Sequence, residues 1–292
     1  IQRDEFKRLG VTGNWADPYL TMDYHAEAVI AGEFMKFLMN GTLYQGSKPV
    51  MWSPVEKTAL AEAEVEYHDH TSHTIWVRFG VVDFGEGSEG FQSQLFEKPV
   101  SVLIWTTTPW TIPQNRAVAF NPDIGYGLYE VVRVAENSSA KPGERLLVAK
   151  QLVSDVFTAA KVDEHRLVAD IGGGALGALT LAHPFRGVEG AKGEWDYPVP
   201  MLPGEHVTDE VGTGFVHTAP SHGDDDYQLG LKFGLPMTYN VEPDGTYRAD
   251  LPIFGGEAII QPDGKDGPAN VSVITQLAYA GALYATVQLK HS

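Results

Sequence analysis

The chain has 292 residues, of which 43% are hydrophobic and 11% aromatic, values typical of one large or two smaller globular domains and not of a disordered or fibrous protein. Its 21 Lys and Arg stand against 38 Asp and Glu, and the net charge of −17 opposes non-specific binding to a phosphate backbone. The absence of cysteine excludes disulfides, thiolate zinc sites and a cysteine nucleophile.

Membrane insertion and export are not expected either. No apolar stretch approaches the roughly 20 residues that a membrane-spanning helix needs. The opening residues, IQRDEFKRLGVTGNW, carry charges where a signal peptide would have its apolar segment. We therefore expect a cytoplasmic protein with no membrane partner.

The first predicted element is an amphipathic helix over about 23–40. Apolar residues recur there at helical spacing as far as Leu38. Thr21 or Asp23 can cap its start, and Gly41 can end it.

Short strands are predicted to follow. Segments rich in Val, Ile and aromatic residues are separated by Gly, Pro, Asn or Asp: TIWVRFGVVDF, SVLIWTTT, RAVAFNP, GLYEVVRV, RLLVA and RLVADIGGG. Helices are fewer, at 151–161 and 224–234. This pattern predicts an α+β fold: a β-rich domain with a barrel-like sheet, peripheral helices and helical connecting arms.

The domain organisation is predicted from the same pattern. A second terminal helix is expected near 271–280, and the turn-rich stretch 241–270 is expected to loop over the surface. We expect a connecting arm at 1–55, a core at 56–255 and a returning arm at 256–292.

The stretch WTTTPWTIPQN at 105–115 follows a buried apolar run. Its prolines end the strand, so Thr108 and its neighbours lie at a strand end, where ligands commonly bind. Composition alone favours the simpler interpretation, a β-branched strand followed by a turn. The flanking tryptophans and Asn115 favour a polar pocket lined by aromatic rings.

The stretch GTGFVHTAPSHGDDDY at 212–227 allows three interpretations: a metal site, an acid/base cluster or a wall that binds a cation. Asp224 and Asp225 can simply stabilise a helix N-terminus, whereas Asp226 lies further along the helix. A metal site would use His217 and His222 with an aspartate. Their spacing of five residues fits a helix face poorly, and no H-E-x-x-H motif is present.

Other chemistry-bearing motifs are missing or weak. HDHTSH at 68–73 could chelate a metal, but without a scaffold motif it is better explained as a solvated turn. The chain has no G-x-S-x-G elbow and no P-loop, and IGGG at 171–174 lacks the dinucleotide spacing. Water is left as the attacking group in any hydrolysis.

Several stretches together resemble the editing insertion (connective peptide 1) of the isoleucyl-tRNA synthetases, a class I family. They are FKRLGVTGNWADPYLTM, TALAEAEVEY, WTTTPWTIPQNRAVAFNP and GTGFVHTAPSHGDDDY, in family order. Valyl and leucyl relatives typically carry an Arg in the threonine-rich stretch, so TTTPWT in this chain favours the isoleucyl member. The H-x-G-H and K-M-S-K-S activating signatures are absent, so we expect a piece of the enzyme that does not activate amino acids.

The resemblance implies hydrolysis of valine from the acceptor end of isoleucine tRNA and, as a second substrate, of valyl-adenylate. A site that fits isoleucine cannot strongly reject valine, since one methylene is worth only about 1–3 kcal/mol, a limit for which this family is itself the established example. The rest of the parent synthetase is the implied protein partner. No cofactor is implied, and Ser53 and Glu56 stand where many relatives have a Cys-x-x-Cys, so no zinc is expected.

The resemblance also implies residue roles. Asp226 would accept the substrate's α-ammonium group. The threonine stretch would hold the terminal adenosine and the ester, with Asn115 supporting that loop and Trp110 packing against it. His217 would limit the size of the amino acid side chain. The residues in these roles are Thr106, Thr107, Thr108 and Asp226 for the reaction, and Trp110, Asn115, His217, His222 and Asp225 for the substrate, the last two as second choices.

Two other functions remain open from the residues alone. One is a non-catalytic module that binds an amino acid or a nucleoside. The other is a metal-dependent hydrolase that uses His217, His222 and an aspartate. Neither accounts for all of the matched stretches.

Overall fold

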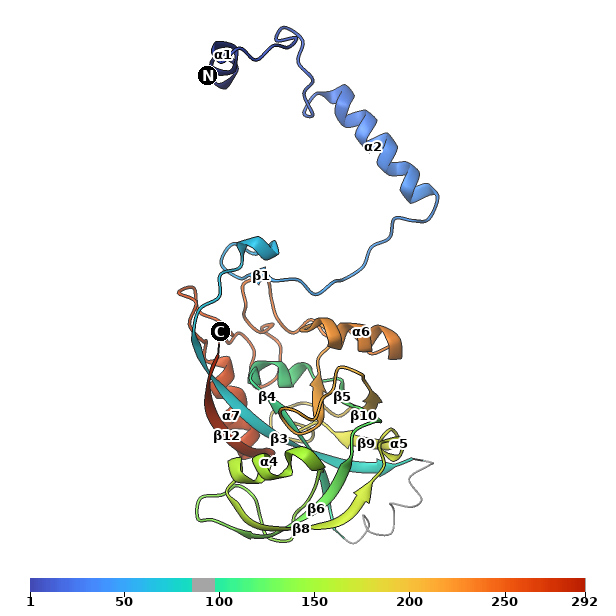
Figure 1. Ribbon diagram of the computed structural model, residues 1–292, viewed down its shortest axis with the longest axis vertical. Helices are drawn as coiled ribbons and strands as arrows, with labels where there is room; N and C mark the ends of the chain where they lie inside the picture. Colours follow the sequence, from blue (N-terminus) through green and yellow to red (C-terminus); the bar gives the residue numbers. More distant parts are fainter. Residues whose placement is uncertain (86–97, 292) are drawn as a thin grey trace. The chain divides into compact units, whose positions relative to one another are not determined.

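The chain divides into two units, Ile1–Ser47 and Lys48–Ser292 (Figure 1). The computed structural model describes residues 1–85 and 98–291. Within these residues, no helix is long and apolar enough to cross a membrane.

The first unit contains two helices, α1 (Gln2–Arg8) and α2 (Tyr24–Met39). The Asp23 carboxylate accepts a hydrogen bond from the backbone N–H of His25 at 2.9 Å and so caps α2. Gly41, with φ of 78°, lies just beyond its end. The helix predicted over 23–40 is therefore present, with Asp23 as its cap.

In its described residues, the second unit is built on a ten-stranded mixed sheet. The strand order is β11-β5-β10-β9-β3-β4-β7-β6-β8, and β12 pairs with β3 outside this path. The bounds are β3 (His70–Phe84), β4 (Val100–Thr106), β5 (Ala117–Phe120), β6 (Tyr126–Val134), β7 (Arg145–Ala149), β8 (Val162–Ile171), β9 (Leu179–Ala182), β10 (Pro198–Pro203), β11 (Phe215–Thr218) and β12 (Leu283–His291). A small separate pair is formed by β1 (Trp52–Ser53) and β2 (Thr58–Ala59).

The sheet does not close. The β10–β5 and β4–β7 pairs are parallel, and the other pairs are antiparallel. Among the described residues β11 and β8 end the path without pairing with each other, and most of β8 is exposed, as expected of an edge strand. The α+β class is confirmed, whereas the expected barrel-like closure is wrong.

Short helices lie around the sheet (Figure 1). They are α4 (Val153–Ala159), α5 (Gly173–Leu176), α6 (Asp224–Phe233) and α7 (Ala269–Tyr279), with 3-10 turns η1 (Glu62–Glu64), η2 (Pro109–Gln114) and η3 (Lys150–Leu152). Helix α7 contacts η2, β3 and β12, and α4 contacts β8. Helix α7 thus supports the segment that follows β4.

Three strands of the large sheet, β9, β10 and β12, lie where the sequence predicts none, and the small pair β1 and β2 is not predicted either. Strand β10 carries Pro198 and Pro200, which are unusual inside a sheet. Its first half pairs with β9 and its second half with β5, so each of these two strands pairs with only three residues of β10. Strand β9 is only four residues long. Strand β12 follows α7 because Gly281, with φ of 69°, turns the chain.

The stretch 241–270 forms only isolated bridges between residues before α7 begins. It does not merely loop over the surface, however, because Tyr247, Leu251 and Phe254 are among the most buried side chains of the core. The turn-rich composition correctly predicts an irregular backbone, but it does not indicate that these three side chains are buried in the core.

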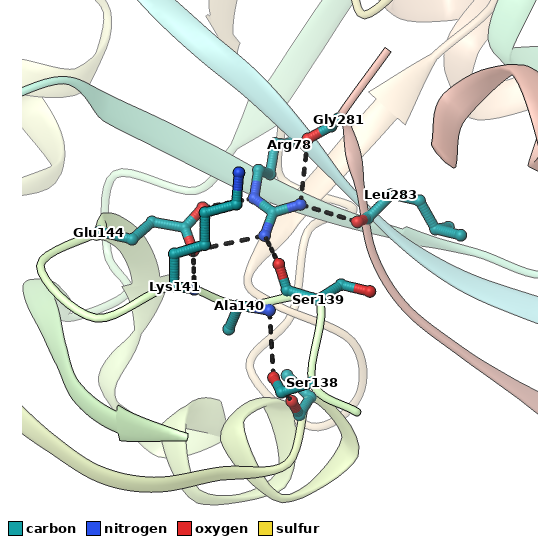
Figure 2. A network of polar contacts seen from close by, with 9 residues as sticks. Arg78, Ser138, Ser139, Ala140, Lys141, Glu144, Gly281 and Leu283 are labelled. Atoms are coloured by element: carbon teal, nitrogen blue, oxygen red, sulfur yellow. Dashed lines mark hydrogen bonds and ion pairs between the residues drawn. The ribbon is translucent and has the colours of Figure 1, made fainter. Parts of the chain in front are cut away.

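Arg78 joins three segments of the second unit (Figure 2). Its guanidinium pairs with Glu144 and donates to the carbonyls of Gly281 at 3.2 Å, Leu283 at 2.7 Å and Ser139 at 2.7 Å. These bonds use all of the nitrogens that arginine can donate from. A hollow of about 290 Å³ lies beside the network. Because all of its nitrogens already donate, Arg78 serves to hold together β3, the turn before β7 and the turn before β12.

Candidate functional site

The threonine loop begins where β4 ends, at Thr106. The Thr106 hydroxyl accepts a hydrogen bond from the Thr108 backbone N–H at 3.1 Å and lies 3.2 Å from the Thr108 hydroxyl. Thr106 is buried, Thr107 is half-buried and Thr108 is exposed. Pro109 then starts the 3-10 turn η2. Thr108 is therefore exposed at the end of the strand, and the buried Thr106 holds the turn through the Thr108 backbone N–H.

A chain of hydrogen bonds connects this loop to β11. The Asn115 amide nitrogen donates to the Ala117 carbonyl at 2.8 Å and lies 2.8 Å from Nδ1 of His217. Nε2 of His217 lies 2.8 Å from the Thr111 hydroxyl, which donates to the Thr108 carbonyl at 2.8 Å. The carbonyls of Thr108 and Ala117, at the two ends of this series of hydrogen bonds, can only accept. Nδ1 must therefore accept from Asn115, and Nε2 must carry the hydrogen that it donates to Thr111.

His217 is consequently a neutral histidine with both ring nitrogens engaged. It is only 7% exposed, and burial, with the nearby His222 as a second cause, lowers its pKa to about 3. Proton acceptance or metal ligation at His217 would require breaking a buried hydrogen bond. The arrangement suits a wall of the site and argues against a general base.

The glycines of GTG determine how β11 enters the sheet. Gly212 and Gly214 have φ of 88° and 80°, which side-chain-bearing residues rarely adopt. A Cβ on Gly214 would also collide with Ala149, and the Tyr126 hydroxyl donates to the Gly214 carbonyl at 2.9 Å. This tight passage fixes the register in which His217 lies opposite Val118 of β5.

Asp226 lies in the first turn of α6. Its Oδ2 accepts a hydrogen bond from the Ala219 backbone N–H at 2.9 Å, which ties the helix to the end of β11. Burial raises the pKa of Asp226 to about 6, and the charge of Asp225 adds to this effect, while the Ala219 bond opposes it. Asp225 itself is exposed. Among the aspartates at the start of α6, Asp226 is therefore the one that is hardest to ionise. A cationic ligand beside it would favour the ionised form.

His222 lies in the turn between β11 and α6. Its backbone N–H donates to the Ala219 carbonyl at 2.9 Å, and its ring meets the Trp110 ring edge to face at 4.9 Å. Burial lowers the pKa of His222 to about 4. Its Nε2 is buried without a hydrogen-bond partner among the described residues. The contact with Trp110 brings the threonine loop and the turn before α6 together.

The structure gathers most of the expected residues but does not form a metal centre from them. Hydrogen bonds join Thr106, Thr108, Asn115 and His217, and the ring contact adds Trp110 and His222. Within residues 1–85 and 98–291, no three or more His, Asp or Glu side chains gather in a way that could hold a metal ion. In HDHTSH, His70 faces Asp266 at 3.3 Å.

Sequence reasoning missed Thr111, although it lies within the quoted threonine stretch. Its hydroxyl is the link between His217 and the Thr108 carbonyl. The signal available was its position three residues after Thr108, because a Thr hydroxyl bonds readily to a carbonyl one turn back. The role of the Ala219 backbone in holding Asp226 had no sequence signal.

A family model described as tRNA synthetases class I (I, L, M and V) matches residues 1–277. The chain is 55% identical over 297 residues to the isoleucine-tRNA ligase of Ruegeria pomeroyi and covers 29% of it. It is 49% identical over 302 residues to that of Caulobacter vibrioides and again covers 29% of it. In both cases 100% of the chain is matched, so the chain spans less than a third of the length of these relatives.

A solved structure shares the fold. The P. knowlesi cytosolic leucyl-tRNA synthetase editing domain matches 75% of this chain and 98% of its own length, with a TM-score of 0.50 and 10% sequence identity. At this identity the likeness concerns the fold alone. The mixed sheet with peripheral helices is thus an architecture found in an editing domain.

Proposed function

Because the chain belongs to the class I tRNA synthetases of the I, L, M and V group, we propose that the unit Lys48–Ser292 hydrolyses valine from the acceptor end of isoleucine tRNA. Valyl-adenylate is the second proposed substrate. The observation that carries the proposal is the partly buried carboxylate of Asp226. The charge of Asp225 raises its pKa further, and among the described residues no Lys or Arg lowers it.

Asp226 anchors the α-ammonium group of the aminoacyl ester. The Ala219 N–H fixes the carboxylate through Oδ2, and the group retains acceptor capacity for a ligand N–H. A hydrogen bond between ionised partners is stronger than one between neutral groups, and the cation would offset the burial that disfavours the carboxylate. The ammonium group of the substrate therefore supplies the positive charge that stabilises the ionised Asp226 carboxylate.

The threonine loop holds the terminal adenosine and the ester in this proposal. The exposed Thr108 offers a hydroxyl and Thr107 a half-buried one, while Thr106 fixes the turn beneath them. Trp110 provides an aromatic face, and Asn115 holds the loop to His217. These groups are fixed before a ligand arrives, which reduces the cost of ordering them.

His217 limits the amino acid by size. Its ring is held at both nitrogens, so it cannot turn aside to admit a longer side chain. The attacking water needs orientation more than a strong base, because the ester is already activated. His222 is the proposed orienting group, since its Nε2 has no hydrogen-bond partner among the described residues and its ring contacts Trp110.

The tRNA is held mainly by other parts of the enzyme. The net charge of −17 makes this chain a poor ligand for a polyanion, so its own affinity for tRNA is expected to be weak and to fall steeply with salt. The rest of the parent synthetase is therefore the proposed partner that delivers the acceptor end.

Calorimetric titration with non-hydrolysable valyl-adenosine and isoleucyl-adenosine analogues tests the proposal without tRNA. We expect the valyl analogue to bind at least about tenfold more tightly, the discrimination that steric exclusion of one methylene can provide. Valyl-adenosine without its α-amino group serves as the matched ligand control and should bind far more weakly, because it lacks the charge that Asp226 meets. Equal affinity for all three analogues would contradict both assigned roles.

A further inference from the structure

The backbone carbonyls of the loop 109–115 are held by side chains from elsewhere in the fold. Four carbonyls each receive a hydrogen bond from a buried or partly buried ring group. The pairs are Tyr247 hydroxyl to Trp110 at 2.6 Å, His183 Nε2 to Ile112 at 3.0 Å, Trp195 Nε1 to Pro113 at 2.9 Å and Tyr197 hydroxyl to Asn115 at 2.6 Å. No other short turn of the site is held in this manner among the described residues.

Pro113 explains why the Trp110 carbonyl needs an outside donor. In a 3-10 turn the carbonyl of residue i bonds to the N–H three residues later, and proline has no N–H. The Tyr247 hydroxyl takes that place at 2.6 Å. The Gln114 amide can reinforce it, because its nitrogen lies 3.1 Å from the same carbonyl in one of the two amide orientations.

The donors are themselves fixed. His183 is 2% exposed, and its Nδ1 accepts from the Phe185 backbone N–H at 3.1 Å, so Nε2 must carry the hydrogen given to Ile112. Its ring stacks on Trp195 at 5.8 Å, and Trp195 packs against Phe254 at 5.9 Å. The back of the loop therefore rests on a packed aromatic cluster.

The tyrosines hold the two loop residues nearest the proposed substrate. Tyr247 bonds to the carbonyl of Trp110, whose ring meets His222. Tyr197 bonds to the carbonyl of Asn115, whose amide meets His217, and the Arg116 guanidinium lies 4.1 Å from the Tyr197 ring centroid. A shift of either carbonyl would move a side chain that faces the site.

We propose that Tyr247 and Tyr197 are positioning residues: their hydroxyls hold Trp110 and Asn115 in the one geometry that receives an aminoacyl-adenosine. The identity of the ligand rests on the proposed function, whereas the restraint on the loop rests on the hydrogen bonds alone. Neither tyrosine need touch the substrate.

The chain offers a matched control for removing a tyrosine hydroxyl. Tyr284 is 1% exposed, and its hydroxyl is buried without a hydrogen-bond partner among the described residues. Tyr284→Phe therefore removes the same atom from the core without removing a hydrogen bond. Tyr197→Phe removes the hydroxyl that donates to the Asn115 carbonyl, and Tyr247→Phe leaves the Trp110 carbonyl with only the Gln114 amide as a side-chain donor.

Backbone hydrogen exchange in the full chain tests the restraint directly. The reporting amides are Thr111, which bonds to Thr108 at 3.0 Å, and Asn115, which bonds to Ile112 at 3.0 Å. Loss of one net hydrogen bond corresponds to roughly a tenfold change in an opening equilibrium. We expect these amides to exchange about tenfold faster in Tyr247→Phe and Tyr197→Phe and at the wild-type rate in Tyr284→Phe. Equal exchange in all four proteins would overturn the proposal.

Binding of the valyl-adenosine analogue tests the consequence for the site. Affinity should fall roughly five- to tenfold in Tyr247→Phe and Tyr197→Phe, at a temperature where all variants are folded, and stay unchanged in Tyr284→Phe. A merely structural role would lower the unfolding midpoint but leave the affinity of the folded protein intact, and that result overturns the positioning role. If the wild-type chain binds no analogue, the proposed function fails, and the exchange rates alone decide whether the tyrosines restrain the loop.

Discussion

Replacement of Asp226 by Asn is expected to make the protein more stable at neutral pH while removing its affinity for the valyl-adenosine analogue. The pKa of Asp226 is raised from 3.8 to about 6, so ionisation in the folded state is costly. Stability is lost as the pH rises from about 3.8 to 6, because the unfolded carboxyl ionises first. Above pH 6 the gain from Asn should be on the order of 2 kcal/mol, with about 3 kcal/mol as its upper limit, and it should shrink below about 1 kcal/mol at pH 4.

Affinity should change in the opposite direction. Removing one partner of a desolvated charge pair costs about 2–5 kcal/mol, so we expect the analogue to bind at least about thirtyfold more weakly. Asp224→Asn is the matched control: it removes an exposed charge from the same helical turn and should alter neither quantity appreciably. Urea unfolding at pH 4.0 and 7.5, with titration at pH 7.5, supplies the measurements. A stability gain that is independent of pH, or unchanged affinity, would contradict the role of Asp226.

Replacement of His217 by Ala is expected to relax the discrimination against isoleucine. The change empties space in the wall of the site and deprives Asn115 and Thr111 of their partner. The ratio of valyl to isoleucyl analogue affinity should fall roughly tenfold, since one methylene accounts for about 1–3 kcal/mol. Stability should fall by about 2–4 kcal/mol, from the cavity and the unpaired buried groups.

Thr111→Val separates these two effects. It removes the hydroxyl that bonds to His217 but keeps the volume, the imidazole ring and its bond to Asn115, so it should lower stability by about 1–2 kcal/mol and lower the affinity ratio much less than His217→Ala does. Titration of both variants with both analogues gives the comparison. A ratio that stays at the wild-type value in His217→Ala would show that another residue excludes isoleucine.

Local signals in the sequence predict where the strand and the helix that border the candidate site end and begin. Pro109 after a β-branched run indicates a strand end, and the aspartates after Gly223 indicate a helix start. The positive φ of Gly212 and Gly214 accounts for GTG in physical terms. The contact of His222 with Trp110 could not be predicted in this way, since more than a hundred positions separate the two residues.

The missing parts of the prediction depend on long-range pairing. Proline argues against a strand at Pro198–Pro203, and only the change of partner from β9 to β5 makes that strand acceptable. The open sheet follows from which strands become edges, and the sequence VDEHRLVADI of β8 does not show that this strand pairs only with β6 among the described residues. Which nitrogen of His217 carries the hydrogen also could not be predicted from the sequence, because the carbonyls at both ends of the series of hydrogen bonds determine it.

Turnover is the central claim, because a binding module would reproduce every affinity described above. The direct measurement is release of valine from isoleucine tRNA carrying radiolabelled valine, by the wild-type chain and by Asp226→Asn, at low salt and at chain concentrations high enough to overcome weak tRNA binding. The account predicts that the wild type releases valine faster than the spontaneous rate, with more than one valine released per protein molecule. Asp226→Asn should release little or none above that rate. Release at the spontaneous rate by a wild-type chain that binds the valyl analogue would contradict hydrolysis and leave a binding module.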